Sequence, residues 1–260
     1  MKLKIIGCGE AFDKQFGNNS SLLLGPTQNI LFDCGYQIPE RIWRDESFSD
    51  SNFIDAIFLS HAHADHTFGM PALLHSMKDN KRKKELVIFG NRGIKKYLVK
   101  ICALAYPKFN ICSLPFKISF KELKGGDTFK WRGLKFSCIK IAHAVPNLMV
   151  RIDLQSKSKS KSKSKSKSLA ISGDGKLTKK SFAKICDVDF LLQEVFTFDV
   201  NLPFHTNLLE LLELFELFKL SKIKLTGITH INQLHRKKVE EYICNDNSYI
   251  SVRPGDIISI

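Results

Sequence analysis

The sequence predicts an α/β protein with two β layers, each covered by helices. Two observations lead to this prediction. Short apolar or β-branched runs that end at Gly, Asp or Ser, such as NILFDCG, are typical of strands joined by tight turns. Along the chain, a group of these strands is followed by helices, and a second group of strands is followed by further helices. This order favours two sheets that each carry their own helices.

The first half of the chain opens with strands and continues with helices. Four strands are predicted in the runs KLKIIGCG, SLLLG, NILFDCG and DAIFLSH. After His66, the segment GMPALLHSMKDNKRKK predicts a helix with a charged end, ELVIFG a strand and NRGIKKYLVKICALAY a second helix.

The second half repeats this succession. Strands are predicted in FKISFKEL, DTFKWRGLKFSCIKIAH, LMVRIDL and SLAISGDG, with GGD as a turn. Next come DVDFLLQEVF, a helix over about residues 207–220, the strand KLTGITHI, the helix QLHRKKVEEYICN and the closing segment ISVRPGDIISI.

Length and composition indicate a globular protein. With 260 residues, 43% of them hydrophobic, the chain can bury a full core, and we expect one domain over residues 1–260. The start MKLKIIGCGEAF does not resemble a secretion signal and no apolar run reaches membrane-spanning length, so we expect a cytoplasmic protein. Seven cysteines lie scattered without CxxC spacing, which favours reduced thiols over a disulfide framework or a zinc knuckle.

The net charge of +14 points to a polyanionic substrate or partner, although part of it is local. Residues 156–168 alternate Ser and Lys and contribute six lysines, which leaves +8 for the rest of the chain. Because this tract has no apolar side chain to bury, we expect a flexible, solvated loop there. Either it is a repeat that expanded where expansion does no harm, or it binds phosphates.

Ligand-type side chains recur directly after apolar strands. HAHADH follows one strand and contributes His61, His63, Asp65 and His66, and three further strand ends are followed by single residues, His143, Asp174 and His230. A single histidine at such a place is more often a hydrogen-bonded structural residue. Four strand ends that converge on one sheet edge, however, would gather five imidazoles and two carboxylates, which is costly without metal because these groups shift each other's ionisation. Two cations would satisfy all of them.

The run His61-Ala-His63-Ala-Asp65-His66 resembles the HxHxDH motif of the metallo-β-lactamase superfamily. The later residues His143, Asp174 in SGD and His230 in THI resemble its remaining ligand motifs in the same order. Asp33 in ILFDCG is similar to an aspartate that braces the metal loop in that superfamily. The resemblance spans nearly the whole chain and implies an αββα sandwich of the metallo-β-lactamase type.

The resemblance also implies how the ligands divide between two metal ions. His61, His63 and His143 would hold the first ion, Asp65, His66 and His230 the second, and Asp174 would bridge them. Imidazole and carboxylate ligands without a thiolate suit zinc, and also manganese or iron, so zinc is the first expectation. A water bridging two such ions would be the nucleophilic hydroxide of a hydrolase.

Within this superfamily, the pattern GDG, LLQEVF, PFHTN, KLTGITHI resembles the tRNase Z (ribonuclease Z) branch. By this resemblance His205 would donate a proton to the leaving oxygen and Glu194 would orient it, as phosphodiester cleavage requires. The alternative is that Glu194 is a charge at a strand end and that His205 lies where Asn207 starts a helix. The expected activity is therefore that of an RNA 3′-end endonuclease, with RNA or tRNA as the substrate.

Two departures from that branch keep other substrates open. The segment GCGEAFDKQFGNNSSLLL lacks the proline-lysine-arginine loop that monitors the tRNA end, and the span from His143 to Asp174 leaves no room for a long, globular tRNA-clamping arm. The Lys-Ser tract occupies the place of that arm and would meet phosphates electrostatically. An enzyme without the arm would cleave small phosphodiesters or cyclic nucleotides. Two further alternatives are a hydrolase that cleaves esters, thioesters or lactones, and a protein that only binds metal.

The predicted helix NLLELLELFELFKL carries more apolar surface than a solvated helix needs. Leu208, Leu211, Phe215 and Phe218 form a stripe that would face the core. Leu209, Leu212, Leu217 and Leu220 place further apolar groups on other sides. Core packing explains this pattern, and a homodimer is the alternative.

Overall fold

The computed structural model describes residues 1–154, 167–219 and 221–260 and divides the chain into two compact units. The N-terminal unit comprises Lys2–Leu123 and Arg253–Ser259. The C-terminal unit comprises Met1, Lys124–Val252 and Ile260. Each unit contains one seven-stranded sheet with helices, which agrees with the two helix-bearing β layers expected from the sequence. The expectation of one domain over residues 1–260 stays a prediction.

The sheet of the N-terminal unit has the strand order β14-β1-β2-β3-β4-β5-β6. Its strands are β1 (Lys2–Gly7), β2 (Ser20–Leu24), β3 (Asn29–Phe32), β4 (Ala56–Leu59), β5 (Leu86–Asn91), β6 (Ile118–Leu123) and β14 (Ile257–Ser259). Strands β3 to β6 run parallel, whereas β1 is antiparallel to both of its neighbours. The carboxyl ends of β3, β4 and β5 therefore lie at the same edge of this sheet.

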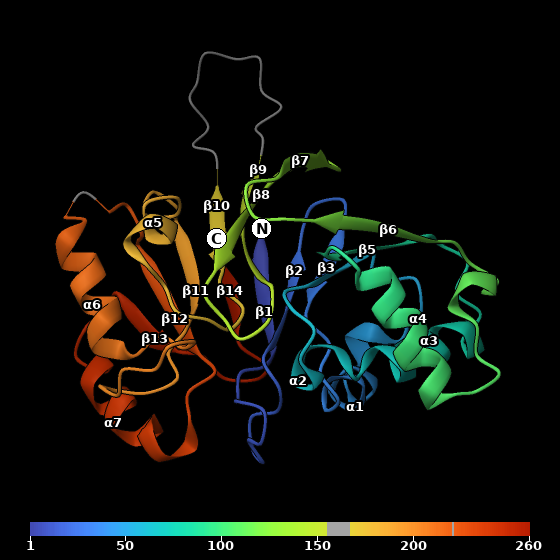
Figure 1. Ribbon diagram of the computed structural model, residues 1–260, viewed down its shortest axis with the longest axis horizontal. Coiled ribbons are helices and arrows are strands. Elements are labelled where there is room, and N and C mark those ends of the chain that lie inside the picture. Colours follow the sequence, from blue (N-terminus) through green and yellow to red (C-terminus); the bar gives the residue numbers. More distant parts are fainter. Residues whose placement is uncertain (155–166, 220) are drawn as a thin grey trace. The chain divides into compact units, whose positions relative to one another are not determined.

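Four α-helices accompany this sheet (Figure 1). They are α1 (Ile38–Arg44), α2 (Ala64–Thr67), α3 (Met70–Asp79) and α4 (Ile94–Ala105), with short 3-10 turns at Glu46–Phe48 and Ile111–Ser113. The apolar sides of α1, α3 and α4 pack against β3 to β5 in one hydrophobic core. The predicted helices after His66 and in NRGIKKYLVKICALAY are thus confirmed as α3 and α4, whereas α1 was not predicted.

The sheet of the C-terminal unit has the order β13-β12-β11-β10-β9-β8-β7. Its strands are β7 (Thr128–Trp131), β8 (Leu134–Ile141), β9 (Asn147–Leu154), β10 (Ser168–Ile171), β11 (Phe190–Glu194), β12 (Leu225–Thr229) and β13 (Tyr249–Ser251). Strand β9 is antiparallel to both β8 and β10, and β10, β11 and β12 run parallel. The carboxyl ends of β8, β10, β11 and β12 consequently share one edge of this sheet.

Among its described residues, the C-terminal unit has the helices α5 (Lys179–Phe182), α6 (Leu208–Leu217) and α7 (Gln233–Ile243), and Figure 1 shows α6 and α7 beside its strands. Asn207 caps α6, because its side chain accepts a hydrogen bond from the Glu210 N–H. The core side of α6 is formed by Leu208, Leu211 and Leu214, with Phe215 and Phe218 partly buried against them. Core packing thus accounts for most of the predicted stripe.

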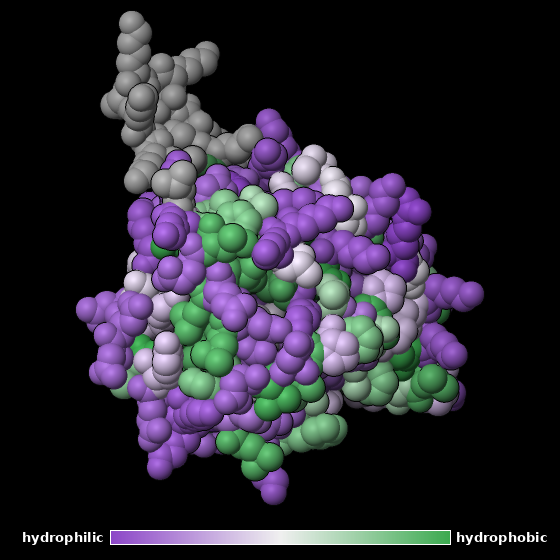
Figure 2. All heavy atoms as spheres, turned by 60° about the vertical axis from the view of Figure 1, so that its left-hand side comes forward, coloured by the Kyte–Doolittle hydropathy of each residue, from purple (hydrophilic) through white to green (hydrophobic). Residues whose placement is uncertain are grey.

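Apolar side chains of α6 also remain on the surface. Leu209 and Leu217 are exposed, whereas Leu220 lies outside the described residues. Figure 2 brings the α6 and α7 side of Figure 1 forward and shows hydrophobic patches separated by hydrophilic residues. A homodimer through these exposed leucines stays a prediction.

The Lys-Ser tract falls almost entirely outside the described residues, which resume at Lys167. Ser168, the last residue of the predicted loop, instead begins β10, where it pairs with Asp153 of β9. Within the described parts of the chain, no helix is long and apolar enough to cross a membrane. All seven cysteines are free thiols, and Cys8, Cys34, Cys102 and Cys138 are buried.

Candidate functional site

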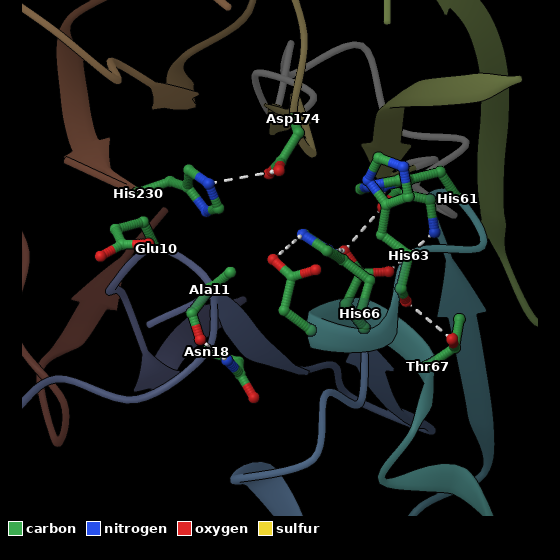
Figure 3. A network of polar contacts seen from close by, with 12 residues as sticks. Glu10, Ala11, Asn18, His61, His63, His66, Thr67, Asp174 and His230 are labelled. Carbon is green, nitrogen blue, oxygen red and sulfur yellow. Dashed lines mark hydrogen bonds and ion pairs between the residues drawn. The ribbon is translucent and has the colours of Figure 1, made fainter. Parts of the chain in front are cut away.

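The HAHADH run lies where β4 ends in the N-terminal unit. His61 and His63 follow the strand directly, and α2 begins after His63, so that Asp65 and His66 lie in the single turn of this short helix. The Nε2 atom of His61 lies 3.1 Å from the Nδ1 atom of His63. Figure 3 shows His61, His63 and His66 gathered at this point. The Asp65 carboxylate lies 3.2 Å from His66 Nε2, and both residues are buried.

Asp33 braces this run from the end of the neighbouring strand β3. One carboxylate oxygen accepts a 2.7 Å hydrogen bond from the Ser60 N–H, and the other accepts bonds from the Ser60 hydroxyl at 2.7 Å and from His66 Nδ1 at 2.8 Å. Asp33 has a φ of 57°, in the left-handed region that aspartate tolerates better than most residues. The bracing role implied by the superfamily resemblance agrees with these contacts.

The same contacts fix which nitrogens of two histidines are available to a metal. Because Asp33 can only accept, His66 must donate from Nδ1, which leaves a lone pair on Nε2. The Ser60 hydroxyl donates its proton to Asp33, so in the 2.9 Å hydrogen bond between Ser60 Oγ and His61 Nδ1 the histidine is the donor. His61 therefore carries its proton on Nδ1 and a lone pair on Nε2. Asp33 thus sets the tautomer of His66 directly and that of His61 through Ser60.

A glycine allows the backbone around Asp65 to pack closely. A Cβ atom on Gly35 would lie 1.9 Å from the Asp65 carbonyl oxygen, so only glycine fits at this position. The His66 carbonyl accepts a 2.8 Å hydrogen bond from the Cys34 N–H. The segment after β3 therefore supports α2 through backbone contacts, and ILFDCG needs its final glycine.

In the C-terminal unit, the three remaining predicted ligands follow strands β8, β10 and β12 at a shared edge. His230 Nε2 lies 3.2 Å from a carboxylate oxygen of Asp174, and Figure 3 shows the two side chains pointing toward one another. His143 contacts the Phe204 carbonyl oxygen through Nδ1 at 3.2 Å, which leaves Nε2 for another partner. The structure therefore places three of the four strand ends at one sheet edge, and the expectation that the end of β4 lies at the same edge is wrong, because β4 belongs to the other sheet.

A hydrogen bond and two unusual backbone conformations accompany this arrangement of Asp174 and His230. The Asn147 side-chain amide donates to the Asp174 carbonyl oxygen, and Gly175 adopts a φ of 137°. His230 itself has a φ of 56°, a left-handed conformation that is uncommon for a residue other than glycine. Strained backbone of this kind occurs at functional sites when the surrounding structure imposes it.

Glu194 and His205 form a pair at the same edge of the C-terminal sheet. Glu194 ends β11 and is fully buried, and one of its carboxylate oxygens lies 2.5 Å from His205 Nδ1. Its other oxygen accepts a 2.9 Å hydrogen bond from the Gly175 N–H. Burial raises the pKa of the Glu194 carboxyl, and the hydrogen bond from His205 acts in the opposite direction. The Phe196 ring stacks on His205 with centroids 4.5 Å apart and fixes the plane of the imidazole.

Several residues that orient these groups were not singled out from the sequence. Ser60 connects Asp33 to His61, and Asn147 holds the Asp174 backbone. Thr206 donates to the Gly175 carbonyl oxygen and accepts from the Leu177 N–H, which ties the His205 loop to the Asp174 loop. Ser60 and Thr206 directly adjoin predicted site residues, and this adjacency is the signal that would have suggested them.

The donor sets in both units fit divalent metal ions. They consist of imidazole nitrogens and carboxylate oxygens, and the ligand atoms within each unit approach one another to 3.1–3.2 Å. His61, His66 and His143 each use the other ring nitrogen for a hydrogen bond to protein, as metal-ligating histidines commonly do. The described residues can therefore hold metal, and this donor chemistry does not distinguish zinc from manganese or iron.

Comparisons with known proteins agree with this arrangement. A model of the Anti-Pycsar protein Apyc1 family matches residues 1–244. Ribonuclease Z of Methanosarcina acetivorans is 30% identical over 149 residues, which is 57% of this chain and 47% of the relative. The chain thus spans about half the length of the curated relatives that it matches.

Two solved structures are similar over nearly the whole chain. The short form of human tRNase Z matches with a TM-score of 0.77 and 19% identity, over 100% of this chain and 99% of that one. The metallo-β-lactamase fold protein YhfI of Bacillus subtilis matches with a TM-score of 0.72 and 16% identity, over 98% and 97%.

These matches confirm the predicted metallo-β-lactamase fold and the predicted resemblance to ribonuclease Z, and they support the prediction of a metal-dependent hydrolase. With the family model covering 244 of the 260 residues, the chain belongs to the Anti-Pycsar protein Apyc1 family.

Proposed function

We propose that this protein is a metal-dependent phosphodiesterase. In this proposal, His61, His63 and His143 would hold one divalent ion, Asp65, His66 and His230 would hold a second, and Asp174 would be shared between them. Ions bound there would supply Lewis acidity and a water activated near neutral pH. Zinc is the first choice, with manganese or iron as alternatives.

The observation that carries the phosphodiesterase proposal is the Glu194–His205 pair. Departure of a poor leaving group, such as a sugar alkoxide, requires a proton, and a histidine held by a carboxylate is suited to donate it. Glu194 accepts from His205 Nδ1 at 2.5 Å, which stabilises the imidazolium form and directs Nε2 away from the carboxylate. In this proposal, His205 gives the Nε2 proton to the leaving oxygen, and Glu194 holds the ring. An ester, thioester or lactone hydrolase would have no evident use for this pair.

The role of His205 can be separated from metal binding. His205→Ala should keep both metals and lose about 10²–10⁴-fold in turnover of a phosphodiester with a poor leaving group. The loss should be much smaller for an activated aryl ester, whose leaving group needs no proton. His75→Ala, which changes a histidine of α3 that is paired with Asp79, serves as the matched control and should retain activity. Equal losses on both substrates, or loss of metal, would contradict the role assigned to His205.

Two substrate classes fit a phosphodiesterase with these residues. Relatives named ribonuclease Z support an RNA 3′-end endonuclease acting on tRNA-like substrates. Two observations favour the second class, small phosphodiesters such as cyclic nucleotides. Only 13 residues connect β9 to β10, too few for a globular arm, and the family model that covers most of the chain carries a name other than ribonuclease Z.

The substrate classes can be tested with one panel and one deletion. The panel contains a precursor tRNA, cyclic mononucleotides, a generic phosphodiester, a thioester and a lactone. A variant that lacks residues 156–166 keeps Ser168 and its pairing in β10. If RNA is the substrate, the deletion should weaken precursor-tRNA binding. It should also reduce the slope of log K against log salt concentration by about two, because each lysine that contacts a phosphate contributes roughly 0.7–0.9 to this slope. Unchanged tRNA affinity and salt slope, with turnover of cyclic nucleotides, would favour the small-diester enzyme.

Two further proposals concern the setting of the enzyme. We place it in the cytoplasm, which agrees with free thiols at all seven cysteines. A homodimer through the exposed leucines of α6 is the alternative to a monomer, and sedimentation of the purified protein distinguishes the two.

A further inference from the structure

The backbone of the His61–His63 segment is held by side chains from other elements. The Asn91 amide, at the end of β5, donates to the Ser60 carbonyl oxygen at 2.7 Å. The Tyr97 hydroxyl, on α4, donates to the Ala62 carbonyl oxygen at 2.9 Å. The Thr67 hydroxyl, at the end of α2, donates to the His63 carbonyl oxygen at 2.7 Å. These three carbonyls lie in a segment that is neither strand nor helix, so side chains supply hydrogen bonds there.

Tyr97 and Thr67 act on this segment together. Their hydroxyl oxygens lie 3.0 Å apart, and each hydroxyl also reaches one of two consecutive carbonyl oxygens, those of Ala62 and His63. The Ala62 carbonyl belongs to the peptide that joins Ala62 to His63, and the His63 carbonyl belongs to the next peptide. Fixing both peptides restricts the orientation of the His63 side chain relative to His61, which precedes it by two residues.

The hydroxyl of Tyr97 is not needed to pack α4. The helix is anchored by Ile94, Leu98 and Cys102, which are buried in the core of the N-terminal unit. The Tyr97 ring is half-buried against the same core, and its hydroxyl oxygen reaches the ligand segment. Removing the oxygen while keeping the ring should therefore leave the packing of α4 intact.

We propose that Tyr97, together with Thr67, is a positioning residue that holds His61 and His63 in a metal-ready arrangement before any ion binds. The inference rests on the proposed function, because it assumes that these two histidines ligate an ion. The two ligand nitrogens, 3.1 Å apart, need little rearrangement to contact one ion. Without the hydrogen bonds from Tyr97 and Thr67 to the Ala62 and His63 carbonyl oxygens, the His61–His63 segment would become ordered only when the metal binds. The free-energy cost of this ordering lowers the affinity for the metal.

Metal titration of the full-length protein tests the inference without any substrate. Protein freed of metal with a chelator is titrated with Co²⁺ alone, using the visible spectrum of bound Co²⁺ and competition with a chromophoric chelator. Tyr97→Phe should weaken Co²⁺ binding by about 10-fold, at the lower end of the 10–100-fold typical for groups that orient metal ligands. Thr67→Val should weaken Co²⁺ binding similarly, because Thr67 donates the second of these two hydrogen bonds, to the His63 carbonyl oxygen. The visible spectrum of the bound Co²⁺ should also change in shape.

The matched control is Tyr106→Phe, since Tyr106 follows α4 and packs on His75 and Phe109, away from the ligand segment. Support requires that Tyr97→Phe loses Co²⁺ affinity while its metal-free melting temperature matches that of Tyr106→Phe. Native Co²⁺ affinity and spectrum in Tyr97→Phe would overturn the inference. So would a drop in metal-free stability that accounts for the whole loss of affinity. Because the readout is metal binding, absent phosphodiesterase activity in the wild type would count only against the proposed function.

Discussion

Replacing Asp33 by Asn tests how far one carboxylate controls the ligands of the N-terminal unit. Asparagine has nearly the same shape and tolerates the left-handed φ of 57° at this position, so the backbone should not change. The carboxylate accepts three hydrogen bonds, two from Ser60 and one from His66. An amide offers one oxygen and one NH₂ group, so it can accept from the Ser60 N–H but cannot also accept from His66.

The consequence reaches two histidines. His66 would have to accept at Nδ1 from the new amide, which places its proton on Nε2, where the carboxylate had left a lone pair. If the amide also donates to the Ser60 hydroxyl, Ser60 donates in turn to His61 Nδ1, and His61 changes tautomer as well. Both rings would then present N–H groups to the position of a metal ion, and metal binding would require a tautomer change in each.

We expect Asp33→Asn to lose about 10–100-fold in metal affinity. It should also lose about 1–3 kcal/mol of unfolding free energy in the metal-free protein, since the hydrogen bonds at this position no longer involve a charged carboxylate. The measurements are chelator competition, urea unfolding and ¹⁵N NMR of the histidine tautomers. Asp55→Asn is the control, because Asp55 is buried in the same unit and accepts a 2.8 Å bond from the Asn29 N–H, away from the ligands. Native metal affinity with unchanged tautomers in Asp33→Asn would refute the relay.

Two further predictions concern the metals and the response to acid. Purified protein should contain close to two metal ions per chain, and Asp174→Ala or His66→Ala should lose metal and hydrolysis together; active enzyme without stoichiometric metal in elemental analysis would contradict this. Although burial acts in the opposite direction, hydrogen bonds from Lys224 and Ser168 hold the pKa of Asp189 below its usual value. Its stabilising contribution is thus present above the unfolded pKa of about 3.9 and is lost as pH falls through the lower folded value. The free energy of unfolding of Asp189→Asn should therefore fall less steeply below about pH 4 than that of the wild type. If the urea midpoints of variant and wild type changed identically from pH 2 to 7, the role assigned to Asp189 would be contradicted.

The strands and the positions of the candidate ligands could be predicted because their signals are local. Each predicted ligand follows an apolar run directly, and all the strands expected in the first half of the chain formed. Helix α1 was overlooked although Pro39 lies in its first turn, a recognised start signal. Helix α5 spans four residues behind a capping box at Thr178 and Ser181, too short for periodicity to reveal it.

The supporting contacts were harder to predict because they join distant parts of the chain. Tyr97 lies 35 residues from Ala62 and looks like an ordinary position of an amphipathic helix. The sequence also did not indicate which strands share a sheet, so the placement of β4 apart from β8, β10 and β12 required the structure. Spacing therefore predicted the candidate metal ligands, whereas the groups that orient them depend on tertiary packing.

The pairing of β14 with β1 has a consequence for how the protein is made. Ile257–Ser259 complete the sheet that begins with Lys2–Gly7, and Gly255 and Asp256 exchange backbone hydrogen bonds with Ile5. During synthesis, the edge of β1 that pairs with β14 therefore stays unpaired until about 250 further residues have been translated. An open strand edge can join another chain, and Lys2 and Lys4 place charges on it that discourage such pairing. Chains that stop before Arg253 should therefore expose this edge and aggregate, even though they would retain every proposed metal ligand.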